Sequence, residues 1–359
     1  MRIVVIQRAC ADFRVGFFDL LNSKKEIHLI SKSSDLGKIK VPKSLLNKSY
    51  FHRSVSVSFK DYIFYPFLFL DLLKISPEII VSEGGQNTIN NITVLLYSKI
   101  RQSKYFIWDL GKLYIDENNS FTRKIYNKLY IYIVKNSSGI LTYNSKSKEY
   151  FRNIFINKKI IVINNTIDTI KVNKIKKTLN TSIQKEIEFR FKSFKGCLLY
   201  VGAINHLKNI ESLEGLIKGL GEKYCIIILG NGEKTYLNKL KKKFQPYNVF
   251  FEGFKKMEEA VYYYNVADFS ILPGLGGLSI NQSLAFNLPV LVNKADGSEF
   301  DLVFDGITGY RYNKIDDLIN FIKNCPKEKI TEMKKNSGDL INDKFTIEKM
   351  AESFLEVID

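Results

Sequence analysis

The residues of this chain best suited to chemistry are glycines and a lysine that follow apolar runs in its second half. Gly202 comes directly after the run CLLYV, and Lys208 lies six residues later, where we expect a helix to begin. A diphosphate bound there would meet both the lysine ammonium group and the free amides of a helix N-terminus. The alternative is a surface lysine in the first turn of a helix.

Two further segments place glycines directly after expected strands. Gly230 and Gly232 lie in LGNGEKTYL, where the absence of side chains permits the close approach of a ligand. Gly253 and Phe254 lie in FEGFKKMEEA, where backbone groups could hydrogen-bond a nucleotide base. An ordinary turn is the alternative for both segments.

The segment ADFSILPGLGGLSINQSLAFNLPVLV carries the strongest signal. We predict a strand, then a glycine-rich loop, then a helix that begins near Leu278. Such a loop would present amide donors to a phosphate from Gly276, Gly277, Leu278 and Ser279. One helical turn further on, Gln282 could hydrogen-bond a ribose diol. The alternative is a tight turn followed by a polar helix residue.

Loops of this kind need parallel strands behind them, because such sheets bind ligands at the carboxyl ends of their strands. The chain alternates short apolar strands with amphipathic helices, a pattern typical of α/β folds with parallel sheets. The expected strands are residues 2–7, 26–30, 78–82, 105–108, 139–142, 160–163, 197–201, 224–229, 249–251, 269–272 and 290–292. The expected helices are residues 13–22, 87–100, 121–135, 145–153, 209–220, 233–244, 257–265, 279–286, 315–323, 330–336 and 346–358.

These elements fall into two domains. Residues 1–168 should form one doubly wound, Rossmann-like domain, and residues 196–340 a second. Residues 169–195 are polar and rich in lysine, so we expect a linker with a short helix. The last helix, within residues 341–359, spaces its apolar residues by three and four and should pack back towards the N-terminal domain.

The order and spacing of the four loops resemble the donor domain of family 4 retaining glycosyltransferases, a domain of the Glycos_transf_1 type. The matching pieces are Gly202 with Lys208, Gly230 with Gly232, NVFFEG at residues 248–253 and AFNLPV at residues 285–290. The resemblance implies a GT-B fold, in which two Rossmann-like domains face each other across a cleft. It also implies transfer of a sugar, with retention of configuration, from a UDP- or GDP-sugar to a glycan or lipid-linked oligosaccharide.

Three positions depart from the family's pattern. Ala203 stands where the family has an arginine, and Gly274 and Gln282 stand in place of its acidic pair. One charge is therefore absent from the diphosphate site, and an amide would replace the carboxylate that contacts ribose. A catalytically weak or inactive protein, acting as a nucleotide-sugar-binding or scaffold subunit, is the alternative function.

The resemblance also implies how the leaving diphosphate would be stabilised. Lys208 and the amides near Gly277 and Leu278 would meet its developing negative charge. The sequence contains no D-x-D motif of the kind that holds a metal in other transferases. We therefore expect no metal and no cofactor, with the nucleotide sugar acting as a co-substrate.

The N-terminal domain would hold the acceptor. Asp109, after an inner strand, could meet the acceptor or the transferred sugar, with Glu83 as its rival. Arg14 could contact an acceptor phosphate, and Gly84 and Gly85 lie where an acceptor-side loop is expected. The alternatives are capping or loop carboxylates and a surface arginine.

The charge and the apolar runs of the sequence indicate which partners and which location to expect. The net charge of +17 suits phosphate-rich partners, although an excess of lysine throughout the chain explains much of it. Residues 59–73 and 123–135 interleave aromatic and basic side chains and could rest on an anionic membrane, or else form buried helix faces. The sequence contains no run of about 18 uncharged apolar residues and no C-x-x-C pair. The apolar run at residues 3–6 is too short for the core of a signal peptide, so we expect none. We expect a cytoplasmic protein at the inner face of the plasma membrane, in bacterial surface polysaccharide assembly such as that of O-antigen or capsule.

Two rival functions remain from the residues alone. Another enzyme with the same architecture, such as a sugar-nucleotide epimerase, would share the fold, because fold alone does not fix chemistry. A nucleic-acid binder would explain the positive charge, but the sequence contains no recognition-helix, RNP-type or zinc module. We therefore expect no nucleic-acid partner.

Overall fold

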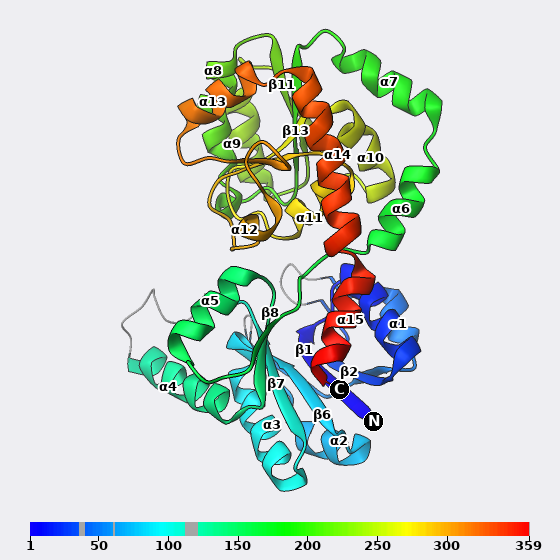
Figure 1. Cartoon of the computed structure of the whole chain (residues 1–359), viewed down its shortest axis with the longest axis vertical. Helices are drawn as coiled ribbons and strands as arrows, with labels where there is room; N and C mark the ends of the chain where they lie inside the picture. Colours follow the sequence, from blue (N-terminus) through cyan, green and yellow to red (C-terminus); the bar gives the residue numbers. More distant parts are fainter. Residues whose placement is uncertain (36–39, 60–61, 112–120, 359) are drawn as a thin grey trace. The chain divides into compact units, whose positions relative to one another are not determined.

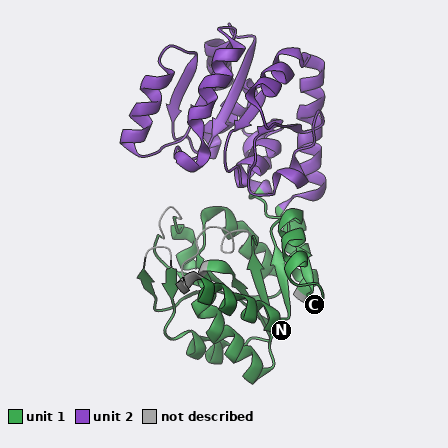
Figure 2. Ribbon diagram, turned by 90° about the vertical axis from the view of Figure 1, so that its left-hand side faces the viewer, with its two compact units in different colours: residues 1–168, 347–359 green, residues 169–346 purple. Residues whose placement is uncertain are grey.

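The chain divides into two compact units in a computed structural model that describes residues 1–35, 40–59, 62–111 and 121–358. The first unit comprises Met1–Asp168 and Ile347–Asp359, and the second comprises Thr169–Thr346 (Figure 2). Residues 60 and 61, inside one of the segments predicted to rest on a membrane, lie outside the described residues.

The first unit is built on a parallel sheet with the strand order β3-β2-β1-β6-β7-β8-β9 (Figure 1). Its strands are β1 (Arg2–Ala9), β2 (Glu26–Lys32), β3 (Phe51–Arg53), β6 (Ile79–Glu83), β7 (Lys104–Asp109), β8 (Gly139–Thr142) and β9 (Ile160–Val162). The inner strands bury apolar side chains on both faces, as is usual for parallel strands that helices cover on both sides. A separate antiparallel hairpin joins β4 (Val57–Phe59) to β5 (Tyr62–Phe64).

Two helical layers cover this sheet. One face carries α1 (Val15–Lys24) and α15 (Ile347–Ile358), and the other carries α2 (Leu68–Ile75), α3 (Thr88–Arg101), α4 (Phe121–Asn136) and α5 (Ser145–Ile154). Short 3-10 helices occur at Asp12–Arg14, Lys43–Asn47 and Gly85–Asn87. The helix α15 packs along α1, so the first unit combines segments that lie far apart in the sequence (Figure 1).

The second unit repeats this design with the strand order β12-β11-β10-β13-β14-β15. Its strands are β10 (Gly196–Val201), β11 (Tyr224–Leu229), β12 (Val249–Gly253), β13 (Phe269–Leu272), β14 (Val290–Val292) and β15 (Gly309–Arg311). Its helices are α6 (Thr169–Lys177), α7 (Thr181–Phe191), α8 (Leu213–Leu220), α9 (Lys234–Phe244), α10 (Met257–Val266), α11 (Leu278–Ala285), α12 (Glu299–Leu302), α13 (Ile315–Asn324) and α14 (Lys327–Lys344). Cys197 and Cys225 face each other across β10 and β11, with their Sγ atoms 3.4 Å apart.

The segment predicted as a linker forms two helices, α6 and α7, that pack against α10. Asn180 caps α7, since its side-chain oxygen accepts hydrogen bonds from the backbone N–H groups of Ser182 and Ile183. The helices bury only a few apolar side chains, such as Ile187 and Phe191, among many lysines. This sparse pattern explains why the sequence did not indicate two packed helices.

Helix α14 is also longer than predicted, because it continues past Gly338. A Cβ atom at Gly338 would lie 2.4 Å from Oδ1 of Asn287, so glycine allows the helix to pack closely on the segment after α11. No helix within the described residues is long and apolar enough to cross a membrane.

Candidate functional site

The four glycine-rich segments follow β10, β11, β12 and β13, which are neighbours in the second sheet. Hydrogen bonds join the first three of them. The N–H of Gly202 donates to the carbonyl oxygen of Leu229 (3.0 Å), and the N–H of Gly230 donates to that of Gly253 (2.8 Å). The loops predicted to hold a nucleotide sugar therefore lie together at the carboxyl edge of one sheet.

Close packing between the backbones explains two of these glycines. A Cβ atom at Gly230 would lie 1.9 Å from the carbonyl oxygen of Gly202, and one at Gly232 would lie 2.1 Å from that of Ile204. Because backbone atoms cannot yield by that much, neither position accepts a side chain. Gly253 differs: its φ of +74° favours glycine, and the space beside it is open. Phe254, which follows it, is 65% exposed.

Lys208 lies in a short 3-10 helix, His206–Lys208, and not in the first turn of an α-helix as predicted. Asn209 adopts a left-handed conformation (φ 49°) directly after it, and α8 begins only at Leu213. The Nζ atom of Lys208 donates a hydrogen bond to the carbonyl oxygen of Leu275. The structure thus brings the lysine charge to the glycine-rich loop after β13, and not to the N-terminus of α8.

That loop leads into α11 through Gly277, whose φ is +55°. The N–H of Ser279 donates to the carbonyl oxygen of Gly276 (3.3 Å), so this amide is occupied, in contrast to the prediction. No acceptor for the N–H groups of Gly276, Gly277 and Leu278 occurs among the described residues. Three consecutive amides and the nearby lysine form a place where an anion would be stabilised.

Gly274 stands where the resembled family has a glutamate, and the structure leaves no room for a side chain there. A Cβ atom would lie 2.5 Å from the carbonyl oxygen of Leu207 and 2.7 Å from the carbonyl carbon of Lys208. The missing acid is therefore replaced by direct packing between the two loops. Gln282 lies half-buried on α11, one turn beyond the amides, and Ala203 is exposed.

Two carboxylates that were not among the predicted site residues lie beside this loop. Asp296 places Oδ2 3.6 Å from the position that a Cβ atom would take at Gly277. Glu299 is buried and accepts hydrogen bonds from the N–H groups of Ala295 (3.0 Å) and Gly297 (2.7 Å). The string D-G-S-E after β14 was the available signal, because acidic residues commonly cap a turn that leads into a helix.

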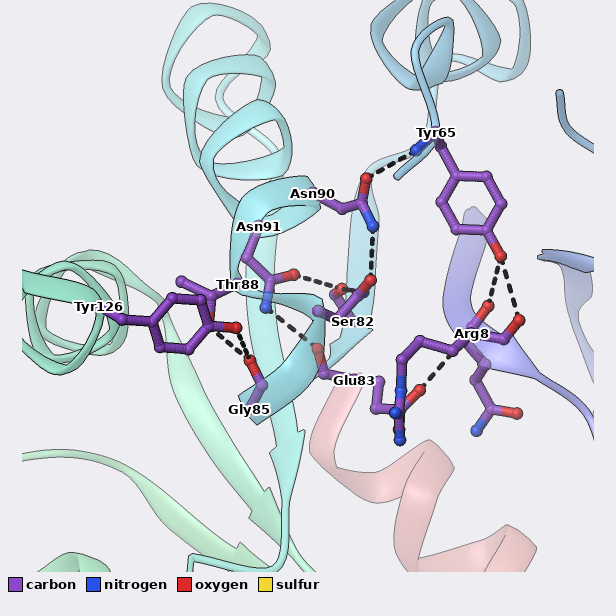
Figure 3. A network of polar contacts seen from close by, with 11 residues as sticks. Arg8, Tyr65, Ser82, Glu83, Gly85, Thr88, Asn90, Asn91 and Tyr126 are labelled. Atoms are coloured by element: carbon purple, nitrogen blue, oxygen red, sulfur yellow. Dashed lines mark hydrogen bonds and ion pairs between the residues drawn. The ribbon is translucent and has the colours of Figure 1, made fainter. Parts of the chain in front are cut away.

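In the first unit, Glu83 ends β6 and pairs with Arg8 at the end of β1 (Figure 3). Its carboxylate accepts hydrogen bonds from the backbone N–H (2.9 Å), Nε (2.9 Å) and Nη2 (2.6 Å) of Arg8. Asn91 donates to the backbone carbonyl of Glu83 at 3.0 Å. The predicted acceptor-side carboxylate is thus held in a part-buried ion pair.

The two glycines after Glu83 lie in a closely packed loop. A Cβ atom at Gly84 would lie 2.0 Å from Oδ2 of Asp109. Gly85 has a φ of +54°, and its carbonyl oxygen accepts hydrogen bonds from the hydroxyl groups of Tyr126 (2.7 Å) and Thr88 (2.5 Å) (Figure 3). This part of the candidate acceptor side is therefore a fixed loop.

Asp109 lies beneath this loop. Tyr130 donates a hydrogen bond to its Oδ2 (2.6 Å), and the N–H of Gly111 donates to its Oδ1 (2.9 Å). Burial raises the pKa of Asp109, and these two hydrogen bonds oppose that rise. Its carboxylate contacts the loop from inside the unit.

Arg14 is buried and not the surface arginine of the alternative interpretation. Its guanidinium group lies 4.5 Å from the ring centre of Trp108 and 5.3 Å from that of Tyr143. Its Nη2 donates to Oδ1 of Asn165 (3.2 Å), whereas its buried Nη1 has no hydrogen-bond partner among the described residues.

Tyr143 lies near all of the charged residues predicted for the acceptor side. Burial raises its pKa to about 12, while the charges of Arg14, Glu83, Asp109 and Arg8 all lie close enough to act on it. The predicted residues of the first unit therefore gather at the carboxyl ends of β1, β6 and β7.

Comparisons with known proteins agree with this geometry. Residues 183–338 match the family model described as glycosyl transferases group 1. No curated protein matches the sequence.

Solved structures match both units together. Among them are HepE from Anabaena in complex with UDP (TM-score 0.76, 14% identity, covering 100% of this chain and 99% of HepE) and sucrose-phosphate synthase from Thermosynechococcus elongatus (0.72, 15%, 99% and 98%). Another is the lipopolysaccharide outer core galactosyltransferase WaaB (0.70, 15%, 100% and 99%). At this identity they show the fold alone, which is GT-B, and the prediction of that fold is confirmed.

Proposed function

We propose that this glycosyltransferase, whose group 1 domain spans residues 183–338, moves a sugar from a nucleoside-diphosphate sugar to a glycan or lipid-linked oligosaccharide. The observation that carries the proposal is the group formed by Lys208 and the amides of Gly276, Gly277 and Leu278, for which the described part of the chain supplies no acceptor. A diphosphate is the ligand whose charge and oxygen atoms fit a lysine beside successive amides.

The donor would lie along the carboxyl edge of the second sheet. The diphosphate would meet Lys208 and the three amides, and the lysine charge and the N–H dipoles would stabilise the leaving group as its bond to the sugar breaks. Gly202, Gly230 and Gly232 let the neighbouring loops pack closely at this edge. The base would lie near Gly253 and Phe254, and Gln282 would hydrogen-bond the ribose.

A uridine nucleotide is the donor that we favour. The matched HepE structures hold UDP in one case and UDP-glucose in another. We further propose that the sugar is transferred with retention of configuration, and that Lys208 and the amides take the place of a metal ion.

On the acceptor side, we propose that Glu83 and Asp109 shape the loop at Gly84 and Gly85 that receives the acceptor. Asp109 is the better candidate for direct contact with the acceptor or the transferred sugar, because Arg8 already neutralises Glu83. Arg14, with its unpaired Nη1, is suited to an acceptor phosphate. The naming of WaaB as a lipopolysaccharide transferase supports a role in bacterial surface polysaccharide assembly at the inner face of the plasma membrane.

A transfer assay with EDTA present tests the proposal. The purified chain would be mixed with UDP-glucose or UDP-galactose and short lipid-linked glycan acceptors, and released UDP and the anomeric form of the product would be measured. We expect UDP release with a retained anomeric configuration, and a rate lower by about 100-fold or more in Lys208→Ala. An inverted product would contradict retention, and a rate abolished by EDTA would contradict independence from metal.

A scaffold function is the second candidate, because Ala203 supplies no charge and Gly274 has no room for a carboxylate. It predicts that UDP-glucose binds and is not consumed with any acceptor.

A further inference from the structure

Helix α3 presents apolar side chains on both of its sides. Val94, Leu95 and Tyr97 point into the core of the first unit, as expected of a helix that covers a sheet. Ile89, Ile92, Leu96 and Ile100 are spaced by three, four and four residues, and each is between 43 and 59% exposed. This spacing places the four on one side of the helix, where a surface helix ordinarily carries polar residues.

The neighbouring helices widen this surface. α3 packs against both α2 and α4 in the layer that covers one face of the first sheet (Figure 1). Large apolar side chains are exposed along the other two helices as well, at Leu70, Leu73, Ile125 and Tyr132, and at Phe67 directly before α2. We call the exposed apolar side chains of these three helices the α2–α4 face.

The hairpin that precedes α2 has the same character. Val57 pairs with Phe64 and Phe59 pairs with Tyr62, and all four side chains are at least 39% exposed. Ile63, whose side chain points to the opposite face of the hairpin, is buried in the core. Tyr62 also contacts Tyr126 of α4, with ring centroids 6.4 Å apart. The hairpin therefore turns an apolar face outward beside the helical layer.

Basic residues accompany the α2–α4 face, and acidic ones are nearly absent. The three helices contain seven lysines and arginines and one acid, Asp71, which accepts a hydrogen bond from Ser54. Lys99 lies on the exposed side, because its Nζ is 5.9 Å from the ring centre of Tyr132 and 3.2 Å from Oδ1 of Asn136. Beside the hairpin, Lys32 donates to Ser58 at 3.0 Å.

We propose that the α2–α4 face, with the hairpin β4–β5, docks the first unit onto an anionic lipid surface. Exposed apolar side chains flanked by lysines and arginines suit the boundary between acyl chains and anionic headgroups. Exposed apolar side chains gathered on three packed helices and a hairpin are typical of a surface that contacts a partner or a membrane. A second copy of the chain fits less well, because a symmetric contact would bring two sets of basic residues together without acids to pair them.

This inference rests on the proposed function in one respect: lipid binding would bring the first unit to a lipid-linked acceptor in the membrane. Lipid binding itself needs neither donor nor acceptor. UDP binding by the second unit is measured on the same samples. A failure of the lipid-binding proposal can then be distinguished from a failure of the proposed donor site.

Vesicle sedimentation of the full chain tests the proposal. Vesicles of phosphatidylglycerol with phosphatidylethanolamine are compared with vesicles of phosphatidylcholine, at low and at high salt. We expect binding to the anionic vesicles, weakened by salt. The double variant Ile92→Glu, Leu96→Glu should lower the partition coefficient by about tenfold or more, because two side chains lose their apolar burial.

A matched control is Phe189→Glu, which changes an exposed apolar residue of α7 in the second unit (67% exposed) and should bind vesicles as the parent does. Circular dichroism checks that all variants are folded. The proposal is overturned if the parent ignores anionic vesicles or if the double variant binds them equally well. It is also overturned if light scattering shows a lipid-free dimer that the double variant abolishes, since a second copy would then cover the face.

Discussion

At the scale of residues, the candidate donor site depends on where backbone atoms pack without side chains between them. Its clustering was predictable, because Gly202, Gly230 and Gly253 follow neighbouring parallel strands. The hydrogen-bond partner of Lys208 was not predictable. Asn209 adopts a left-handed conformation that ends the short helix, and Lys208 donates to the carbonyl oxygen of Leu275. Asp296 was missed because its nearness to Gly277 depends on how two loops fold over one edge.

Gly274 gives a direct test of this packing. Gly274→Ala would put a Cβ atom against the backbone of Leu207 and Lys208, so we expect a loss of about 1–3 kcal/mol in the free energy of unfolding and weaker UDP binding. Urea unfolding and calorimetric titration measure the two effects. Gly215→Ala is the control, because its new Cβ atom would meet only Ile315 at 3.9 Å. Equal stability and UDP affinity in Gly274→Ala and the parent would refute the packing described here.

Asp109 predicts a pH dependence of stability. Burial raises its pKa in the folded chain above the value of about 3.9 expected when unfolded, so the fold favours the protonated form. Its contribution is fully present below that unfolded value and is lost as pH rises through the folded pKa. The parent should therefore lose stability relative to Asp109→Asn as pH rises from about 4. Urea unfolding of both proteins between pH 4 and 7 checks this, and a difference that stays constant with pH would contradict it.

At the scale of elements, compact apolar runs were predictable, and segments without such a run or period were not. β8, β11, β13 and β14 coincide with their predicted ranges because each is a compact apolar run. β3 (FHR) and β4 (VSF) each contain a polar residue within three, and β5 and α2 lie in one apolar segment in which no single period stands out. The apolar side of α3 was overlooked, since a sequence does not say which of two apolar stripes faces the core.

Helix α15 gives the test at this scale. Phe354 is fully buried, with its ring centroid 5.6 Å from that of Phe17 and 5.7 Å from that of Trp108. Phe354→Ala should destabilise the first unit by about 3–5 kcal/mol, because it leaves a cavity between the sheet and α15. Trp108 is the only tryptophan in the sequence, so its fluorescence reports this unfolding. The exposed Phe189 is the control site, where alanine should change stability by less than about 0.5 kcal/mol; similar losses at both positions would speak against the packing of α15.

At the scale of the whole molecule, the two units carry different groups and would therefore bind different partners. The second unit has the lysine and the free amides that suit a diphosphate, and the first has buried charges beneath a fixed loop and an exposed apolar face flanked by basic residues. The net charge of +17 would suit both proposed partners, since nucleotide sugars and anionic lipids are both negatively charged.

A thermal-shift titration tests the proposed metal-independent diphosphate site around Lys208 most directly. UDP, GDP and their sugars would be added without metal to the parent, to Lys208→Ala and to the control Lys218→Ala in α8. At about 100 times its dissociation constant, the correct nucleotide should stabilise the parent and the control by about 2.7 kcal/mol and leave Lys208→Ala nearly unchanged. The absence of any shift in the parent, or an equal shift in Lys208→Ala, would contradict the account.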